Sequence, residues 1–157
     1  MTLEGSNFEM ATFTQIFYHI VFSTKNRERT LNSQRREELY QYIWGIFKNK
    51  KCALYRINGT EDHLHILCDL HPTVPLADLI KDIKLASSRW IKDKTVFPKF
   101  TYWQEGYGAF THSKKDKKRL VNYITNQLEH HKKRSFQDEL CALLIEAGID
   151  FDERFLV

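Results

Sequence analysis

Two histidines, His63 and His65, lie two positions apart in the apolar stretch His63–Cys68, and their spacing could support chemistry. Successive side chains of a β-strand point to opposite faces, so the two imidazoles would share one face while Leu64 and Ile66 occupy the other. Two imidazoles on one face can bind a single divalent metal ion. A pair of exposed strand histidines would give the same pattern, so this stretch leaves both interpretations open.

A second candidate group lies on a later stretch whose apolar residues recur at helical spacing. On such a helix Tyr123 and Gln127 lie one turn apart, at the edge of the apolar stripe. A tyrosine among cations can lose its proton more easily and can be presented to a phosphodiester. A half-buried tyrosine whose hydroxyl meets water is the alternative. The basic residues around it are Lys114, Lys115, Lys117, Lys118 and Arg119 before it, and His130, His131, Lys132, Lys133 and Arg134 after it.

Charge is unevenly distributed over the last third of the chain. The net charge of +4 by itself indicates little about partners. Residues 111–135 contain eight Lys and Arg against two acidic residues, whereas residues 136–157 contain six acidic residues against one Arg. A basic helix followed by an acidic tail is typical of a protein with one surface that meets a polyanion, although a solvated helix face would look the same.

Length and composition predict a single domain over residues 13–157, after a flexible arm over residues 1–12. A chain of 157 residues with 42% hydrophobic content can bury a compact core. No run approaches the roughly 20 apolar residues of a membrane span, and the N-terminus lacks a signal-peptide pattern, so we expect a cytoplasmic protein with no membrane association. Three cysteines without zinc-finger spacing are expected to be buried thiols.

The elements that must position these residues alternate in type along the chain. The expected strands cover residues 13–24, 52–57, 63–70 and 101–111. The expected helices run from a cap at Asn32 or Ser33 to about Lys50, from a cap at Thr73 to Lys92, and from Lys114 to about Lys132, with a short helix and an anchored tail after them. This order predicts an α+β fold: a ferredoxin-like βαββαβ antiparallel sheet with both helices on one face, to which the tyrosine-bearing helix is a C-terminal addition.

Other residues near these strands have simpler expected roles. His19, in the first strand, fits a core or rim histidine better than a metal ligand. Asp62 and Glu61 lie close enough along the chain to orient one of the two histidines, although an exposed turn suits Glu61 better. The fold hosts many functions, so the function must be inferred from the candidate site.

Four stretches of the chain, taken together and in order, resemble the single-tyrosine transposases of the IS200/IS605 type. They are Tyr18–Lys25, Asp62–His65, Trp103–Phe110 and Asn122–Gln127. The resemblance spans about residues 13–131, nearly the whole chain. The His-Leu-His stretch alone is weakly specific for this family, whereas the ordered set of four is strongly specific.

The resemblance implies a metal-dependent enzyme that cuts and rejoins single-stranded DNA beside hairpins at the ends of a mobile element. In this family, also called HUH endonucleases, Tyr123 would be the nucleophile and would form a covalent 5′-phosphotyrosine. His63, His65 and Gln127 would be the metal ligands. The family also implies a homodimer with composite sites. Because the phosphotyrosine bond stores the energy of the cut phosphodiester, no nucleotide cofactor is expected.

The identity of the metal follows less directly from these residue types. Imidazoles favour borderline ions, whereas phosphate chemistry commonly uses Mg²⁺, which prefers oxygen ligands. Mn²⁺ satisfies both preferences, and Mg²⁺ fits the family. We therefore expect Mg²⁺ or Mn²⁺ as the cofactor.

Contacts to DNA are expected from basic side chains that follow phosphates and from aromatic side chains that stack on unpaired bases. Two other functions stay open. One is a non-catalytic ferredoxin-like module that binds nucleic acid and in which the histidines are structural. The other is a domesticated relative that processes hairpins without moving itself. The candidate DNA contacts are Lys84, Arg89, Lys114, Lys115, Lys118 and Arg119.

Overall fold

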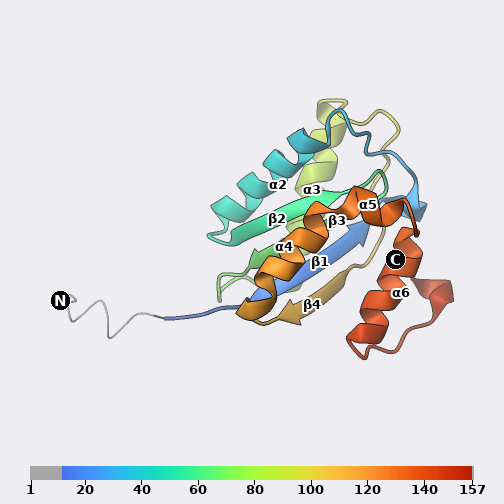
Figure 1. Ribbon diagram of the computed structural model, residues 1–157. Helices are drawn as coiled ribbons and strands as arrows, with labels where there is room; N and C mark the ends of the chain where they lie inside the picture. The colour runs from blue at the N-terminus through green and yellow to red at the C-terminus, as the bar shows by residue number, and fades with distance from the viewer. Residues whose placement is uncertain (1–11, 157) are drawn as a thin grey trace.

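Residues 12–156 are described by the structure, a computed structural model of the chain; nearly all of the expected N-terminal arm lies outside them. Four strands form one sheet in the order β2-β3-β1-β4, and each neighbouring pair is antiparallel (Figure 1). This arrangement confirms the predicted ferredoxin-like α+β fold. The strands are β1 (Phe17–Ser23), β2 (Ala53–Gly59), β3 (His63–Asp69) and β4 (Gly108–His112).

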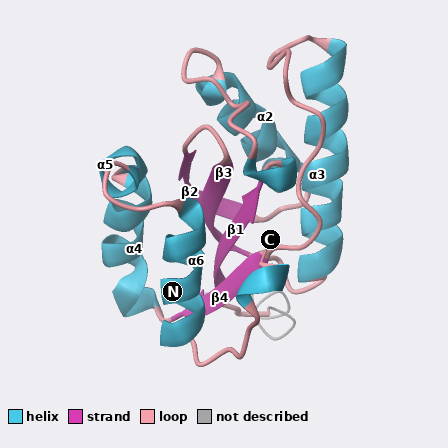
Figure 2. Ribbon diagram, turned by 90° about the vertical axis from the view of Figure 1, so that its right-hand side faces the viewer, coloured by secondary structure: helices cyan, strands magenta, loops and turns pink. Residues whose placement is uncertain are grey.

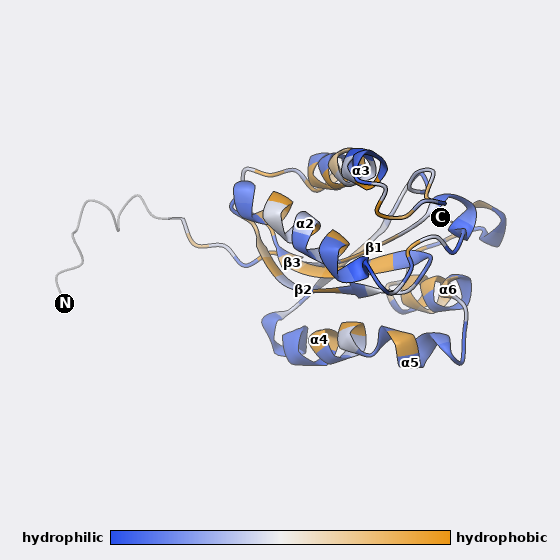
Figure 3. Cartoon of the chain, turned by 90° about the horizontal axis from the view of Figure 1, so that it is seen from above, coloured by the Kyte–Doolittle hydropathy of each residue, from blue (hydrophilic) through white to orange (hydrophobic). Residues whose placement is uncertain are grey.

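Helices cover both faces of this sheet. Helices α2 and α3 pack on one face, as expected, whereas α4, α5 and α6 lie on the other (Figures 2 and 3). The central strands β1 and β3 are therefore buried on both sides. The helices are α2 (Arg36–Asn49), α3 (Leu76–Asp93), α4 (Lys117–Thr125), α5 (Gln127–His131) and α6 (Phe136–Glu146), and short 3-10 turns lie at Lys25–Arg27, Lys114–Asp116 and Glu153–Phe155.

Side chains of β3 alternate between the two faces, as its sequence predicts. Leu64 and Ile66 join the large core beneath α2 and α3. Leu67 points the other way and packs against α4. His63 and His65 share the face of Leu67 and are completely buried, so both imidazoles lie in the layer between the sheet and helices α4–α6.

The strand boundaries are narrower than the sequence pattern indicates. Strand β1 begins at Phe17 instead of residue 13. Strand β4 covers Gly108–His112, and residues 101–107 before it form a loop in which Trp103 makes an isolated bridge to Thr24. Lys84 of α3 holds this loop, because its ammonium donates to the carbonyls of Gln104 at 2.7 Å and Gly106 at 2.6 Å. The loop is therefore fixed by a side chain from a different element.

The expected helix caps are wrong in two places. Helix α2 begins at Arg36, and neither Asn32 nor Ser33 caps it. Helix α3 begins after Pro75, whose extended backbone lies outside the helix, and the hydroxyl of Thr73 contacts the His71 ring at 2.7 Å instead. The chain enters both helices later than the capping residues suggest.

The tyrosine-bearing helix is broken in two. The sequence predicts one helix from Lys114 to about Lys132, but α4 ends at Thr125 and α5 begins at Gln127. Asn126 between them has a non-helical backbone, with φ −95° and ψ 24°. Tyr123 and Gln127 therefore lie on two consecutive short helices instead of one continuous helix.

Two further expectations concern cysteines and membranes. Cys52 and Cys68 are buried free thiols, as expected, whereas Cys141 is partly exposed. Within residues 12–156, no helix combines the length and the apolar character that crossing a membrane would require.

Candidate metal centre and nucleophile

Strand β3 positions the two histidines, and neighbouring polar groups fix the His63 ring. Its Nδ1 lies 2.7 Å from Oδ1 of Asp62 and 3.0 Å from the hydroxyl of Thr60. Thr60 and Asp62 belong to the turn between β2 and β3. The expectation that Asp62 orients a histidine therefore agrees with the geometry.

A third histidine supports His65. His19 of β1 is completely buried, as a core histidine should be, and its Nε2 lies 2.8 Å from Nδ1 of His65. The two rings stack with their centroids 5.1 Å apart. With Nδ1 of His65 engaged in this way, its Nε2 is the nitrogen that faces the interior of the site.

Helices α4 and α5 bring Tyr123 and Gln127 to the same place. Leu120 and Ile124 pack on Leu67 of β3, which lays α4 along the sheet. The Tyr123 ring then lies 5.8 Å from the His65 ring, centroid to centroid. The Gln127 side chain is completely buried, and its Oε1 lies 3.2 Å from Nε2 of His63. All four residues predicted for the site thus converge within one chain.

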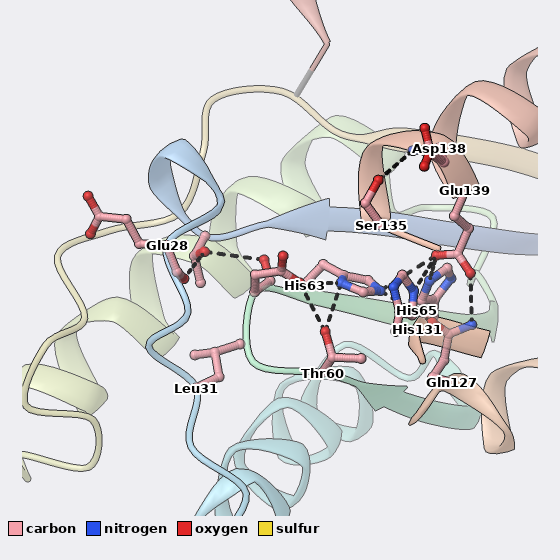
Figure 4. Close-up of polar contacts among 12 residues, drawn as sticks. Glu28, Leu31, Thr60, His63, His65, Gln127, His131, Ser135, Asp138 and Glu139 are labelled. Atoms are coloured by element: carbon pink, nitrogen blue, oxygen red, sulfur yellow. Dashed lines mark hydrogen bonds and ion pairs between the residues drawn. The ribbon is translucent and has the colours of Figure 1, made fainter. Parts of the chain in front are cut away.

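The carboxylate of Glu139 occupies the centre of this group (Figure 4). Its Oε1 lies 2.7 Å from Nε2 of His65, 3.2 Å from Nε2 of His131 and 3.5 Å from Nε2 of His63. Its Oε2 accepts hydrogen bonds from the Tyr123 hydroxyl and, at 3.2 Å, from the Gln127 amide.

The charge pattern of the sequence does not mark Glu139 or His131 as site residues, because Glu139 lies in the acidic tail and His131 lies in the basic stretch after Tyr123. A signal was present. Phe136 and Leu140 lie one turn apart on α6 and are buried against Val21 and Phe110 of the sheet. Glu139, three residues after Phe136, falls on this same apolar side of the helix. A carboxylate on a buried helix face requires partners, which marks it as a candidate site residue.

Comparison with known proteins gives the family. The family model described as "Transposase IS200 like" matches residues 12–127, about three quarters of the chain. The chain belongs to the IS200-like transposase family. The IS200 transposases of Salmonella typhimurium and Salmonella typhi are each 27% identical over 120 residues, which cover 73% of this chain and 78% of each relative.

Two solved structures share the fold of this transposase. One, described as a transposase from Deinococcus radiodurans, matches with a TM-score of 0.59 and 23% identity, over 74% of this chain and 94% of that one. The other is a REP-associated tyrosine transposase bound to a REP hairpin, with a TM-score of 0.60 and 15% identity, over 77% of this chain and 72% of that one.

The charges within the transposase site are strongly coupled. Burial would raise the pKa of Glu139, but its hydrogen bonds to His131, His63 and His65 hold that pKa far below the usual range. Burial and the neighbouring carboxylate together raise the pKa of the Tyr123 hydroxyl. In this arrangement the carboxylate is therefore ionised and the tyrosine keeps its proton, so the expectation that surrounding cations make this proton easier to lose is wrong for the structure as it stands.

The two strand histidines differ in their pKa. Burial lowers the pKa of His65 to about 4, and the positive charges of its histidine neighbours act in the same direction. Burial also opposes the charged form of His63, but hydrogen bonds to Asp62 and Glu139 outweigh it and raise the pKa of His63. His65 is thus neutral at pH 7, which is the form of imidazole that binds a metal.

The residues predicted to contact DNA do not lie on one surface. Lys84 is 8% exposed, and its ammonium is engaged with the loop before β4. Arg89 is exposed on α3, on the opposite face of the sheet from α4. The other four predicted DNA contacts are exposed around the start of α4, the helix that carries Tyr123. They are Lys114, Lys115, Lys118 and Arg119.

Proposed function

We propose that this transposase cuts and rejoins single-stranded DNA beside hairpins, with Tyr123 as the nucleophile and a divalent metal, Mg²⁺ or Mn²⁺, as cofactor. One observation carries the proposal: the Tyr123 hydroxyl, Gln127 and the histidine pair, which are distant in sequence, converge in one site. The relative bound to a REP hairpin supports the choice of substrate.

The donors fit a metal ion. His63 and His65 are buried, the Nδ1 atoms of both rings have partners outside the site, and both Nε2 atoms face its interior. His63, His65 and the amide oxygen of Gln127 would hold the metal. When bound, it polarises the scissile phosphate and stabilises charge on the leaving 3′ oxygen.

The chain supplies the nucleophile for the covalent step. The Tyr123 oxygen bonds to the phosphorus and loses its proton, while the bond from phosphorus to the 3′ oxygen breaks and that oxygen becomes a 3′ hydroxyl. A 3′ hydroxyl from another strand reverses the step, releases Tyr123 and joins the DNA. Each step exchanges one phosphoester bond for another, so cutting and joining need no added energy source.

The remaining parts of the proposal concern DNA contacts and assembly. Exposed Lys114, Lys115, Lys118 and Arg119 are suited to phosphates near Tyr123. Exposed Arg89 would serve a second stretch of DNA across α3. Lys84 is not part of this proposal, because its ammonium is engaged by the carbonyls of Gln104 and Gly106. A homodimer of the 13–157 domain would supply two tyrosines, enough for two strand ends. The proposed location is the cytoplasm, where DNA is accessible.

The test uses a labelled single strand that carries the hairpins flanking the gene, incubated with the full-length protein and Mn²⁺. We expect a protein–DNA adduct that survives denaturation, and its loss in Tyr123→Phe. Tyr42→Phe is the matched control, since Tyr42 stacks on Trp90 beneath the opposite face of the sheet. An adduct that persists in Tyr123→Phe refutes the nucleophile. Hairpin binding without any adduct favours the non-catalytic module, and cutting without strand joining favours the hairpin-processing relative.

A further inference from the structure

The interior nitrogen of His63 faces oxygen atoms that cannot donate to it. A carboxylate only accepts hydrogen bonds, so Nδ1 of His63 carries the hydrogen that Asp62 receives at 2.7 Å. In the neutral ring Nε2 is then a lone pair. It faces Oε1 of Gln127 at 3.2 Å and Oε1 of Glu139 at 3.5 Å. Buried acceptors that face one another are costly unless a cation lies among them, and either a proton on Nε2 or a metal ion bound to it meets that need.

Four ligand atoms surround this point. One ring nitrogen each of His63, His65 and His131 and a carboxylate oxygen of Glu139 all lie within 4.8 Å of one another. Metal–ligand bonds of about 2.0–2.2 Å separate neighbouring ligand atoms by roughly 3–4 Å around a tetrahedral or octahedral ion. The four groups therefore need only small movements to bind one ion together.

The surroundings hold Glu139 in a ligating orientation. Its Oε2 is occupied by Tyr123 and Gln127, so Oε1 remains directed at the three imidazoles. The ring of Phe136, one turn earlier on α6, stacks on His63 with a centroid distance of 4.3 Å and fixes the helix over the site. Such supporting contacts are what orient metal ligands in proteins.

We propose that His131 and Glu139 join His63 and His65 as ligands of one transition-metal ion, which makes the centre a site of three histidines and one carboxylate. This rests on the proposed function in taking the histidine pair as metal ligands. Three nitrogen donors select Mn²⁺, Fe²⁺, Co²⁺ or Zn²⁺ over Mg²⁺, which prefers oxygen. A six-coordinate ion would keep two further positions, one for the amide oxygen of Gln127 and one for a ligand from outside the chain.

The test measures metal binding by the full-length, metal-free protein without DNA, with Mn²⁺ and Mg²⁺ as probes in equilibrium dialysis. We expect one Mn²⁺ per chain and Mg²⁺ at least tenfold weaker. Glu139→Gln and His131→Ala should each weaken Mn²⁺ binding by about 10–100-fold or more, since loss of even a supporting contact costs that much. Glu146→Gln makes the same change at an exposed position of α6 and should bind Mn²⁺ as the wild type does.

Co²⁺ supplies a second measurement, because its absorption spectrum reports its ligands. We expect the visible bands to change in both ligand variants and not in Glu146→Gln. Wild-type Mn²⁺ affinity and Co²⁺ spectra in Glu139→Gln and His131→Ala would overturn the proposal, as would equal affinity for Mg²⁺ and Mn²⁺. His131 is only partly buried, so His131→Ala provides the answer if Glu139→Gln fails to fold. Since DNA is absent, failure of strand cutting leaves this result unaffected.

Discussion

Asn58 links the edge strand β2 to the helix that carries Tyr123, and replacing it by alanine tests how the nucleophile is positioned. Its side-chain amide donates to the carbonyl of Ile124 at 3.0 Å and to that of Thr125 at 3.1 Å. Both carbonyls lie at the end of α4, where the helix breaks and lacks further backbone donors. Asn58 therefore fixes the chain between Tyr123 and Gln127.

The expected loss of stability follows from these contacts. The Oδ1 of Asn58 also accepts a hydrogen bond from the Tyr40 hydroxyl at 3.3 Å. Three hydrogen bonds at about 0.5–1.5 kcal/mol each predict that Asn58→Ala lowers the free energy of unfolding by about 1.5–4.5 kcal/mol. For a chain of this size, each kcal/mol corresponds to roughly 2–4 °C in melting temperature. A misplacement of the nucleophile by about 1 Å can lower the reaction rate roughly 100-fold. The rate of adduct formation should therefore fall even under conditions in which Asn58→Ala is fully folded.

The assay compares urea unfolding with the initial rate of covalent adduct formation, measured where each variant is fully folded. Asn122→Ala is the matched control, since Asn122 is exposed on α4 and alanine favours helix. We expect its stability and its rate to stay near the wild-type values. If Asn58→Ala loses stability but keeps the wild-type rate of adduct formation, the positioning role of Asn58 is refuted.

Three other substitutions test close packing and buried charge in the fold. A Cβ at Gly59 would lie 2.1 Å from the His63 carbonyl oxygen, so Gly59→Ala should lower the free energy of unfolding by about 1–3 kcal/mol or more. Gly45 faces open space on α2, so Gly45→Ala should raise the free energy of unfolding by about 0.5–1 kcal/mol. Urea unfolding measures both. Burial lowers the pKa of Lys84 to about 8. Between about pH 8 and pH 10.5 the unfolded chain therefore binds more protons than the folded chain. The free energy of unfolding of the wild type should rise with pH through this window, relative to that of Lys84→Met, by about 1–3 kcal/mol after allowance for screening. A difference in urea midpoint that is independent of pH would contradict this assignment.

Much of the fold is predictable because its signals are local. Alternation along β3 predicts that His63 and His65 share a face, and helical spacing predicts that Tyr123 and Gln127 project together. The order of strands and helices predicts the βαββαβ sheet, which the structure confirms. The assignment of these four residues as nucleophile and ligands stays a prediction.

The break at Asn126 and the use of Lys84 are not visible in the sequence. Helical periodicity continues through Asn126, and the donor that satisfies the carbonyls at the break comes from Asn58 of β2. Lys84 resembles an exposed helix cation until its ammonium is seen to hold the loop before β4. In both cases the deciding partner comes from an element distant in the chain.

By itself, the sequence determined which side chains share a face of β3 and which lie one turn apart near Tyr123, because periodicity depends only on local backbone geometry. The tertiary structure decided that all of them meet within one chain, and that Glu139 enters their centre together with His131. This placement depends on Phe136 and Leu140 packing against the sheet. A long-range contact of this kind depends on how whole elements dock, which residue spacing within one element does not encode.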